Sequence, residues 1–170
     1  MAENVYYREL QRFRQWWLWA VVLTVSALIW FGFIRQIFLG KPFGTNPLPD
    51  PLMIVFFILF GIGLPLVFIC QRLTCEVRRD GLYVRFFPIH FKPRRIAWTQ
   101  IQSYRTINDA PLQRFGGWGV RMNMKGEWAY TMGGTEGVEL VLRSGKMIVI
   151  GSGNAAALKR AMDRVFLTKN

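Results

Sequence analysis

Two long stretches without a charged residue dominate the first 70 residues of the chain. Trp16 to Ile34, WWLWAVVLTVSALIWFGFI, and Leu52 to Cys70, LMIVFFILFGIGLPLVFIC, each contain 19 residues. A helix of this length is about 28 Å long, close to the ~30 Å hydrocarbon core of a bilayer. The alternative is that each stretch is the buried core helix of a soluble protein, but a chain of 170 residues rarely buries two such helices. The sequence therefore predicts two transmembrane helices.

A cleavable signal peptide is the other interpretation of the first stretch. Its apolar run is longer than the hydrophobic region of a signal peptide, and no small-x-small cleavage site follows Ile34. Trp16, Trp17 and Trp19 gather at one end and Trp30 lies near the other, as aromatic anchors at membrane interfaces do. We therefore expect a permanent anchor.

Basic residues flank the two stretches unevenly, with seven on the outer flanks and two in the connecting loop. Lys and Arg are enriched on the cytoplasmic side of membrane proteins. The sequence thus predicts that both termini are cytoplasmic, at the cell (inner) membrane. The basic residues are Arg8, Arg12 and Arg14 before the first stretch, Arg35 and Lys41 in the loop, and Arg72, Arg78, Arg79 and Arg85 after the second.

These signals divide the chain into five parts. The loop between the helices, GKPFGTNPLPD, is rich in Pro and Gly, and Asp50-Pro51 is typical of a helix start. The expected parts are a cytoplasmic segment at 1–15, transmembrane helices at 16–38 and 51–70, an external loop at 39–50 and a cytoplasmic domain at 71–170.

After residue 71 the pattern changes to an alternation of apolar and polar residues. Cys75 to Arg78 and Leu82 to Phe86 alternate in this way around Asp80-Gly81. Asp-Gly between alternating runs predicts a hairpin with a type I′ turn, which needs positive φ at both central residues. A second hairpin is expected from Val138 to Ile150, with its turn at Ser144-Gly145.

Four shorter strand candidates and one helix complete the cytoplasmic part. About eight short strands at this spacing are typical of an all-β sandwich or open barrel. The helix is predicted from apolar residues at 158, 161, 162, 165 and 166, with Ser152 or Asn154 as its cap. The strand candidates are Arg94 to Trp98, Ile101 to Ile107, Gly117 to Met122 and Glu127 to Met132.

The stretch MIVIGSGNAA, which begins at Met147, has the G-x-G-x-x-A spacing of a dinucleotide-binding turn. That fingerprint works inside a βαβ unit with a returning parallel strand and an acidic residue about 20 positions on. Here 17 residues follow Gly153, and the strand that enters the turn belongs to an antiparallel hairpin. We therefore expect no dinucleotide. A weaker alternative, an anion held by N–H groups at the helix start, stays open.

Strands in two sheets closed by one C-terminal helix are the plan of pleckstrin-homology (PH)-like domains. The chain resembles an uncharacterised family of prokaryotic membrane proteins with two N-terminal spans and a bacterial PH-like domain. The resemblance implies an all-β PH-like domain of about seven or eight antiparallel strands, and it implies no activity. It is carried by QRFRQWWLW (Gln11 to Trp19), RFFPIHFKPRRIAW (Arg85 to Trp98), RFGGWGVR (Arg114 to Arg121) and GVELVLRSGKMIVIGS (Gly137 to Ser152).

A search for catalytic, metal and cofactor motifs finds little. The only histidine, His90, lies in the apolar FPIHF, where a structural role is the simpler interpretation. Glu136 and Glu139, the one close acidic pair after residue 71, fit a solvated face. Cys70 and Cys75 have no metal spacing and are expected as free thiols. We expect no enzyme, no metal and no cofactor; an enzyme acting on a lipid or small anion at the GSGN turn is the alternative.

Residues 71–170 contain 17 Lys and Arg against seven acidic residues, a net charge of +10. Nucleic acid is not expected as a partner, because no recognised nucleic-acid motif is present. Attraction to an anionic membrane surface explains the excess, since each Lys or Arg near that surface contributes about 1 kcal/mol. A general basic character without a specific headgroup site is the alternative. The candidate lipid contacts are Arg72, Arg78, Arg79, Arg94 and Arg95.

The segment GGWG places Gly116, Gly117 and Gly119 around Trp118. Glycines in a strand mark a bulge or a close backbone approach. Either Trp118 fills the core beneath them, or the segment forms a groove for a partner strand. We expect a membrane-tethered binding module that assembles with itself or with a membrane protein. Recognition of anionic lipid headgroups by the basic face is the alternative function.

Overall fold

The computed structural model describes residues 5–108 and 114–166, which form two compact units. One unit is the helical segment at 14–70. The other combines residues 5–13 with the chain after residue 70. The short N-terminal segment therefore belongs to the β-rich domain, which the sequence did not predict.

The helical unit is a hairpin of two apolar helices, both long and apolar enough to cross a membrane. They cover Trp16–Phe38 and Asp50–Cys70, within one residue of the predicted ranges. Each contains a π-helical stretch. The elements are α1 (Trp16–Phe33), η1 (Ile34–Phe38), α2 (Asp50–Phe56), η2 (Phe57–Gly63) and α3 (Leu64–Cys70).

Pro65 explains the irregular stretch of the second helix. Proline has no N–H, so the carbonyl four residues earlier, that of Gly61, loses its helical donor. The indole Nε1–H of Trp30 donates to this oxygen at 3.1 Å, and the hydroxyl of Ser26 donates to the Phe60 oxygen at 3.0 Å. Two side chains of α1 thus donate hydrogen bonds to carbonyls of the π-helical stretch that precedes Pro65.

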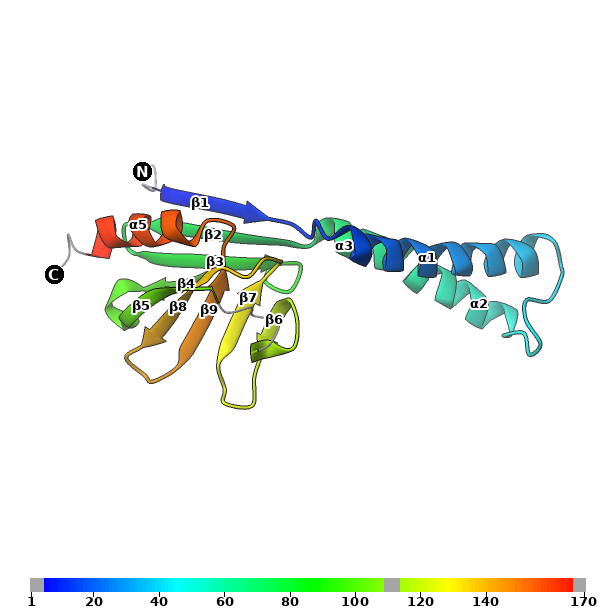
Figure 1. Ribbon diagram of the computed structural model, residues 1–170. Helices are drawn as coiled ribbons and strands as arrows, with labels where there is room; N and C mark the ends of the chain where they lie inside the picture. Colours follow the sequence, from blue (N-terminus) through cyan, green and yellow to red (C-terminus); the bar gives the residue numbers. More distant parts are fainter. Residues whose placement is uncertain (1–4, 109–113, 167–170) are drawn as a thin grey trace. The chain divides into compact units, whose positions relative to one another are not determined.

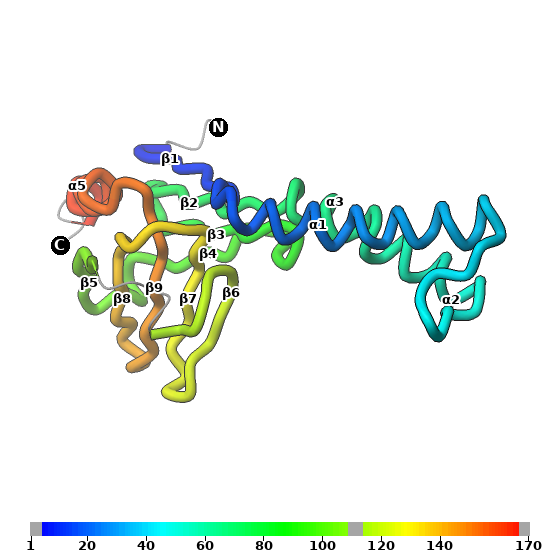
Figure 2. The backbone as a smooth tube through the Cα atoms, turned by 45° about the vertical axis from the view of Figure 1, so that its right-hand side comes forward, coloured from blue at the N-terminus to red at the C-terminus, as the bar shows by residue number. Residues whose placement is uncertain are grey.

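Sheet A of the β-rich domain is an antiparallel meander in the order β1-β2-β3-β4. Strand β1 lies beside β2, as both backbone views show (Figures 1 and 2). The inner residues of β2, Leu73, Cys75 and Val77, are fully buried. The strands are β1 (Val5–Gln11), β2 (Arg72–Arg78), β3 (Gly81–Phe87) and β4 (Arg94–Ala97).

Sheet B has five strands in the order β5-β8-β9-β7-β6. The β8–β9 hairpin is inserted between β5 and β7, so β9 pairs with β7 in parallel, whereas the sequence predicted antiparallel strands throughout. Residue spacing alone does not report which strand a hairpin will join. The strands are β5 (Ile101–Ile107), β6 (Gly119–Met122), β7 (Trp128–Thr131), β8 (Gly137–Leu142) and β9 (Met147–Gly151).

Helix α5 (Ala155–Phe166) packs on the core between the two sheets, as the sequence predicted. Its apolar stripe of Leu158, Ala161, Met162 and Val165 is buried. The Asn154 side chain caps the helix by accepting a hydrogen bond from the Ala157 N–H at 2.9 Å. The predicted amphipathic helix and its cap are confirmed.

The first hairpin forms as predicted, but the predicted turn type is wrong. Arg78 pairs with Gly81, so the turn residues are Arg79 and Asp80, and among the described residues no non-glycine has positive φ. Gly81 is instead the first residue of β3. A Cβ at this position would lie 2.5 Å from the carbonyl oxygen of Ile96 on β4. The glycine therefore allows close strand approach rather than a type I′ turn.

Candidate functional site

The outer face of sheet A carries a row of arginines because β2 alternates strictly between core and solvent. Arg72, Thr74, Glu76 and Arg78 all point away from the core, between buried neighbours. Two-residue periodicity of this kind places every second side chain on one face of the sheet.

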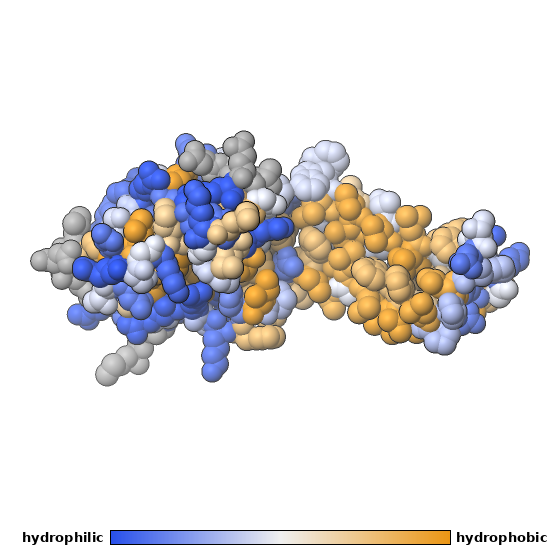
Figure 3. Space-filling model, turned by 90° about the horizontal axis from the view of Figure 1, so that it is seen from below, coloured by the Kyte–Doolittle hydropathy of each residue, from blue (hydrophilic) through white to orange (hydrophobic). Residues whose placement is uncertain are grey.

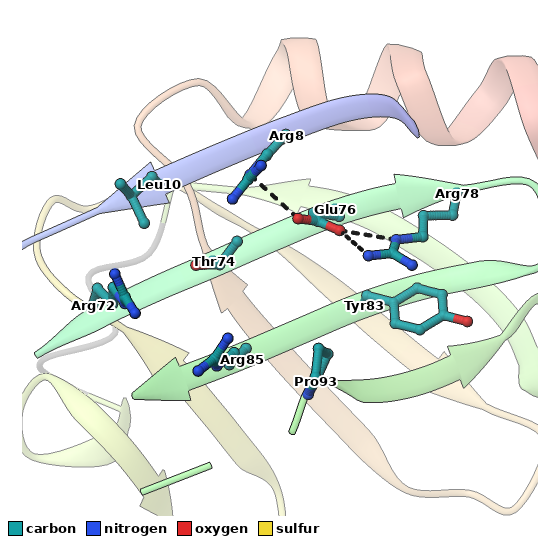
Figure 4. A pocket seen from close by; sticks show the side chains of 9 residues that line it. All are labelled: Arg8, Leu10, Arg72, Thr74, Glu76, Arg78, Tyr83, Arg85 and Pro93. Atoms are coloured by element: carbon teal, nitrogen blue, oxygen red, sulfur yellow. Dashed lines mark hydrogen bonds and ion pairs between the residues drawn. The ribbon is translucent and has the colours of Figure 1, made fainter. Parts of the chain in front are cut away.

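The neighbouring strands extend this face. In the register, Glu76 lies between Arg8 of β1 and Tyr83 of β3, and Thr74 lies between Leu10 and Arg85. Together these side chains surround a shallow pocket of about 240 Å³ (Figure 4). We call it the arginine pocket; its lining residues are Arg8, Leu10, Arg72, Thr74, Glu76, Arg78, Tyr83, Arg85 and Pro93.

Glu76 is the one acidic residue in the lining, and two arginines neutralise it. Arg8 Nε lies 3.3 Å from Glu76 Oε1. Arg78 binds Glu76 Oε2 through two nitrogens, at 2.9 and 2.6 Å. The Arg78 guanidinium also lies 4.4 Å from the ring centre of Tyr83. These contacts order one end of the pocket.

The other end of the pocket keeps its positive charge. Arg72 and Arg85 lie 5.1 and 5.6 Å from the ring centre of Phe87 and have no acidic partner among the described residues. The Nε–H of Arg85 is buried and has no hydrogen-bond acceptor among the described residues. A buried donor without an acceptor is unfavourable. Two guanidinium groups at one site form a suitable receptor for a phosphate or carboxylate.

The structure brings only some of the predicted lipid contacts to this pocket. Arg72 and Arg78 line it, and Arg95 lies on the same face, with its Nε 3.0 Å from an oxygen of Asp80. Arg79 is exposed in the β2–β3 turn, at the far end of β2 from Arg72. Arg94 is turned the other way, and it donates to the hydroxyl of Tyr130 at 2.9 Å.

Arg8 and Arg85 are the lining arginines that the site prediction omitted. Arg85 could have been found, because it has the same parity as Tyr83 in an alternating strand. Arg8 could not, because its place depends on β1, which pairs with a strand more than 60 residues away.

The GGWG segment leads into β6, an edge strand of sheet B. Strand β6 pairs with β7 on one side only, among the described residues. Gly116, Gly117 and Gly119 all have positive φ, and a Cβ on Gly117 would lie 2.9 Å from the Arg121 guanidinium. Trp118 is half-buried and is not part of the main core. The glycines thus shape the approach to an open strand edge.

The helix start at GSGN already holds an anion, and that anion is a side chain of the protein. Glu9 on β1 accepts from the Ser152 hydroxyl at 2.6 Å and from the Gly153 N–H at 2.6 Å. Tyr7 donates to the same carboxylate at 2.9 Å, and hydrogen bonding to Glu9 adds to burial in raising the pKa of Tyr7 to about 12. The position expected for an external anion is therefore taken by Glu9.

Glu139 is buried, so its interpretation as part of a solvated face is wrong. It is 1% exposed and binds Arg105 at 2.8 Å and Arg114 at closer range. Burial raises the pKa of this carboxyl, but hydrogen bonds from Arg114 and Arg105 leave the pKa below its ordinary value. Arg114 also binds Glu127 at 3.0 Å. This cluster holds the segment before β6 against the outer face of sheet B.

The remaining reactive side chains that the structure describes form no cluster. Cys70 and Cys75 are free thiols, as predicted, and burial raises the pKa of the Cys75 thiol. Within residues 5–108 and 114–166, no three His, Cys, Asp or Glu side chains lie together as metal ligands. His90 is half-buried beside the ring of Tyr130, with ring centres 5.8 Å apart.

These features define a class of protein with an apolar helical hairpin and a two-sheet domain closed by a helix. Residues 2–166 match a protein family of unknown function, DUF6141, and the chain belongs to that family. The comparisons with curated proteins and with solved structures gave no match.

Proposed function

We propose that the chain is a two-span membrane protein whose β-rich unit is a PH-like binding domain. The helices support spanning, since only 17% and 11% of their most apolar stretches are buried, and a core helix would be mostly buried. On the face drawn in Figure 3, most of the surface of the helical unit is apolar, and its outer end is hydrophilic. Two sheets closed by a C-terminal helix support the PH-like assignment.

Strand β1 supports a topology with both flanks on one side of the membrane. Residues 5–11 precede the first helix and residues 72–78 follow the second, yet they pair in a single sheet. A pair of spanning helices that returns the chain to its starting side permits this pairing. The excess of Arg on these flanks then favours the cytoplasmic side of the inner membrane.

The function that the site supports best is recognition of anionic lipid headgroups by the arginine pocket. The single observation that carries this proposal is the pair Arg72 and Arg85, which have no acidic partner among the described residues, together with the buried, unpaired Nε–H of Arg85. Arg72 follows the last residue of the second helix, Cys70, by two positions. Along the chain, a single residue, Gln71, separates this arginine from the second helix.

Native mass spectrometry of the full chain from nanodiscs tests this function. Discs of phosphatidylcholine with phosphatidylglycerol are compared for the native chain and for the double variant Arg72→Gln, Arg85→Gln. The control Arg143→Gln, Arg160→Gln removes the same charge from exposed positions outside the pocket. We expect the pocket variant alone to lose retained phosphatidylglycerol. Equal retention by all three proteins would contradict the proposal.

Assembly through the edge of β6 is a second candidate function. The edge is open among the described residues, and Met122 and Met124 beside it are both exposed. Strand addition to an open edge is a common mode of protein recognition. Cross-linking through Arg121→Cys, with Lys146→Cys in the β8–β9 turn as control, tests it. If Arg121→Cys gives only monomers and no reproducible neighbour, this candidate is wrong.

A further inference from the structure

The loop between β3 and β4, residues 88–93, exposes two large apolar side chains. Ile89 is 59% exposed and Phe91 is 74% exposed, although the loop is short and belongs to a well-packed sheet. Lys92, also exposed, follows them directly. Large apolar side chains grouped at a loop tip indicate an interaction surface.

The base of this loop is fixed, so the exposure is a stable feature. The His90 N–H donates to the Phe86 oxygen at 2.7 Å and closes the turn. The His90 ring faces inward and lies beside Tyr130. Arg94 donates to the hydroxyl of the same tyrosine at the other end of the loop. Because the His90 side chain points toward the domain, the side chains of its neighbours Ile89 and Phe91 are exposed to solvent.

The loop lies at the end of sheet A where both connections to the helical unit leave. Phe87, the last residue of β3, pairs with Arg72, and Gln11, the last residue of β1, pairs with Leu73. One residue, Gln71, separates β2 from the second helix, and residues 12–15 separate β1 from the first. The chain therefore passes from this end of the sheet to each helix through no more than four residues.

We propose that this loop inserts Ile89 and Phe91 into the headgroup–acyl boundary of the bilayer that the two helices span. Lys92, Arg72 and Arg85 then lie at headgroup level. Apolar side chains flanked by basic residues are the usual composition of segments that bind membrane interfaces. The inference rests on the proposed membrane-spanning helices and adds a third, non-spanning membrane contact that orients the domain.

Photocross-linking of the full chain tests this contact. Benzoylphenylalanine replaces Phe91 in one variant and Ile89 in a second, so that a folding defect at one position does not decide the result. Met124, fully exposed at the tip of the β6–β7 hairpin, takes the same replacement as the matched control. Each protein is irradiated in nanodiscs of phosphatidylcholine alone and of phosphatidylcholine with phosphatidylglycerol, and adducts are identified by mass spectrometry.

We expect lipid adducts at positions 89 and 91 in both lipid mixtures, at least tenfold above position 124. Adducts to a second copy of the chain in place of lipid, equal lipid adducts at all three positions, or none at 89 and 91 would overturn the proposal. The neutral discs separate it from headgroup recognition. Insertion requires adducts in phosphatidylcholine alone, whereas the arginine pocket requires phosphatidylglycerol, so either can fail without the other.

Discussion

The carboxylate of Glu9 joins the N-terminal strand to the start of the C-terminal helix. It accepts short hydrogen bonds from Ser152 and Gly153, where the helix dipole also favours a negative charge. We expect Glu9→Gln to lower the free energy of unfolding by about 1–2 kcal/mol, because charge-assisted bonds are replaced by weaker ones. Urea denaturation of the full chain in mild detergent measures this. Glu136→Gln, at an exposed position, is the control and should change stability little.

Trp30 gives a second test at the scale of a residue. Its indole donates to the Gly61 carbonyl, for which Pro65 offers no α-helical N–H donor. Trp30→Phe keeps the aromatic ring but removes the N–H. We expect the free energy of unfolding to fall by about 0.5–1.5 kcal/mol, the range for a hydrogen bond between two apolar helices. Unfolding of the chain by sodium dodecyl sulfate in mixed micelles measures it. Trp16→Phe is the matched control, because Trp16 is 80% exposed; a similar loss in both variants would contradict this role for the indole.

Single residues show where sequence reasoning stops. It recognised Asp80-Gly81 as part of a hairpin, but it assigned the glycine to the turn, whereas the constraint comes from the Ile96 carbonyl on another strand. It placed Glu139 in solvent, because the covering Arg114 is 25 residues away in the chain. Local patterns predict what a residue does to its own backbone, and they do not report which distant group will face it.

Among the described strands, β1 is the one that the sequence did not predict, and its inward side chains explain why. Glu9 and Gln11 lie on the face of β1 that turns toward the core, opposite Cys75 and Leu73. The Gln11 amide donates to the Gly151 oxygen at 2.7 Å, as Glu9 accepts from the same turn. Tyr7 on the same face packs against the core, but the two inward residues that follow it are polar, so the alternation that identifies a half-buried strand is absent. The strands with apolar inner faces, β2, β3, β5, β8 and β9, were all predicted.

The ion cluster on sheet B predicts how the domain responds to acid. Its two carboxyls, Glu139 and Glu127, both have pKa values below their ordinary range. For Glu127 the main cause is the hydrogen bond from Arg114, whereas for Glu139 such bonds outweigh the opposing effect of burial. A carboxyl with a lowered pKa in the folded state stabilises the protein above its unfolded pKa. This stabilisation is lost as the pH falls from about 5 through the lowered values.

We therefore expect Glu139→Gln to be less stable than the native chain at pH 7, since it leaves Arg105 and Arg114 without their shared charged partner. The variant should also lose less stability than the native chain between pH 5 and pH 3. Urea midpoints of both proteins at these three pH values measure the effect. Parallel pH profiles for the two proteins would show that Glu139 does not carry the acid sensitivity.

At the scale of the whole molecule, the sequence predicted both apolar helices, the two sheets and the closing helix, but it predicted the candidate site only in part. The two apolar helices can be predicted from their composition alone, because this prediction does not depend on long-range contacts. The arginine pocket depends on which strands lie side by side, and Arg8 enters it through β1. The same pairing binds the two flanks of the helical hairpin into one domain, and this gives a prediction for the complete chain.

If both helices span the membrane, the flanks must share one side and residues 39–50 must lie on the other. In a Cys70→Ser background, where the remaining Cys75 is fully buried, Thr45→Cys should react with an impermeant maleimide added to intact cells. Lys125→Cys, exposed on the β6–β7 hairpin, should react only after the cells are opened. If Lys125→Cys reacts in intact cells and Thr45→Cys does not, both helices still span the membrane, but the orientation is opposite to the one predicted from the flanking arginines. If both sites react in intact cells, the loop and the β-rich domain lie on the same side of the membrane, which contradicts two spans. The pairing of β1 with β2 would then form with no membrane between the loop and the domain.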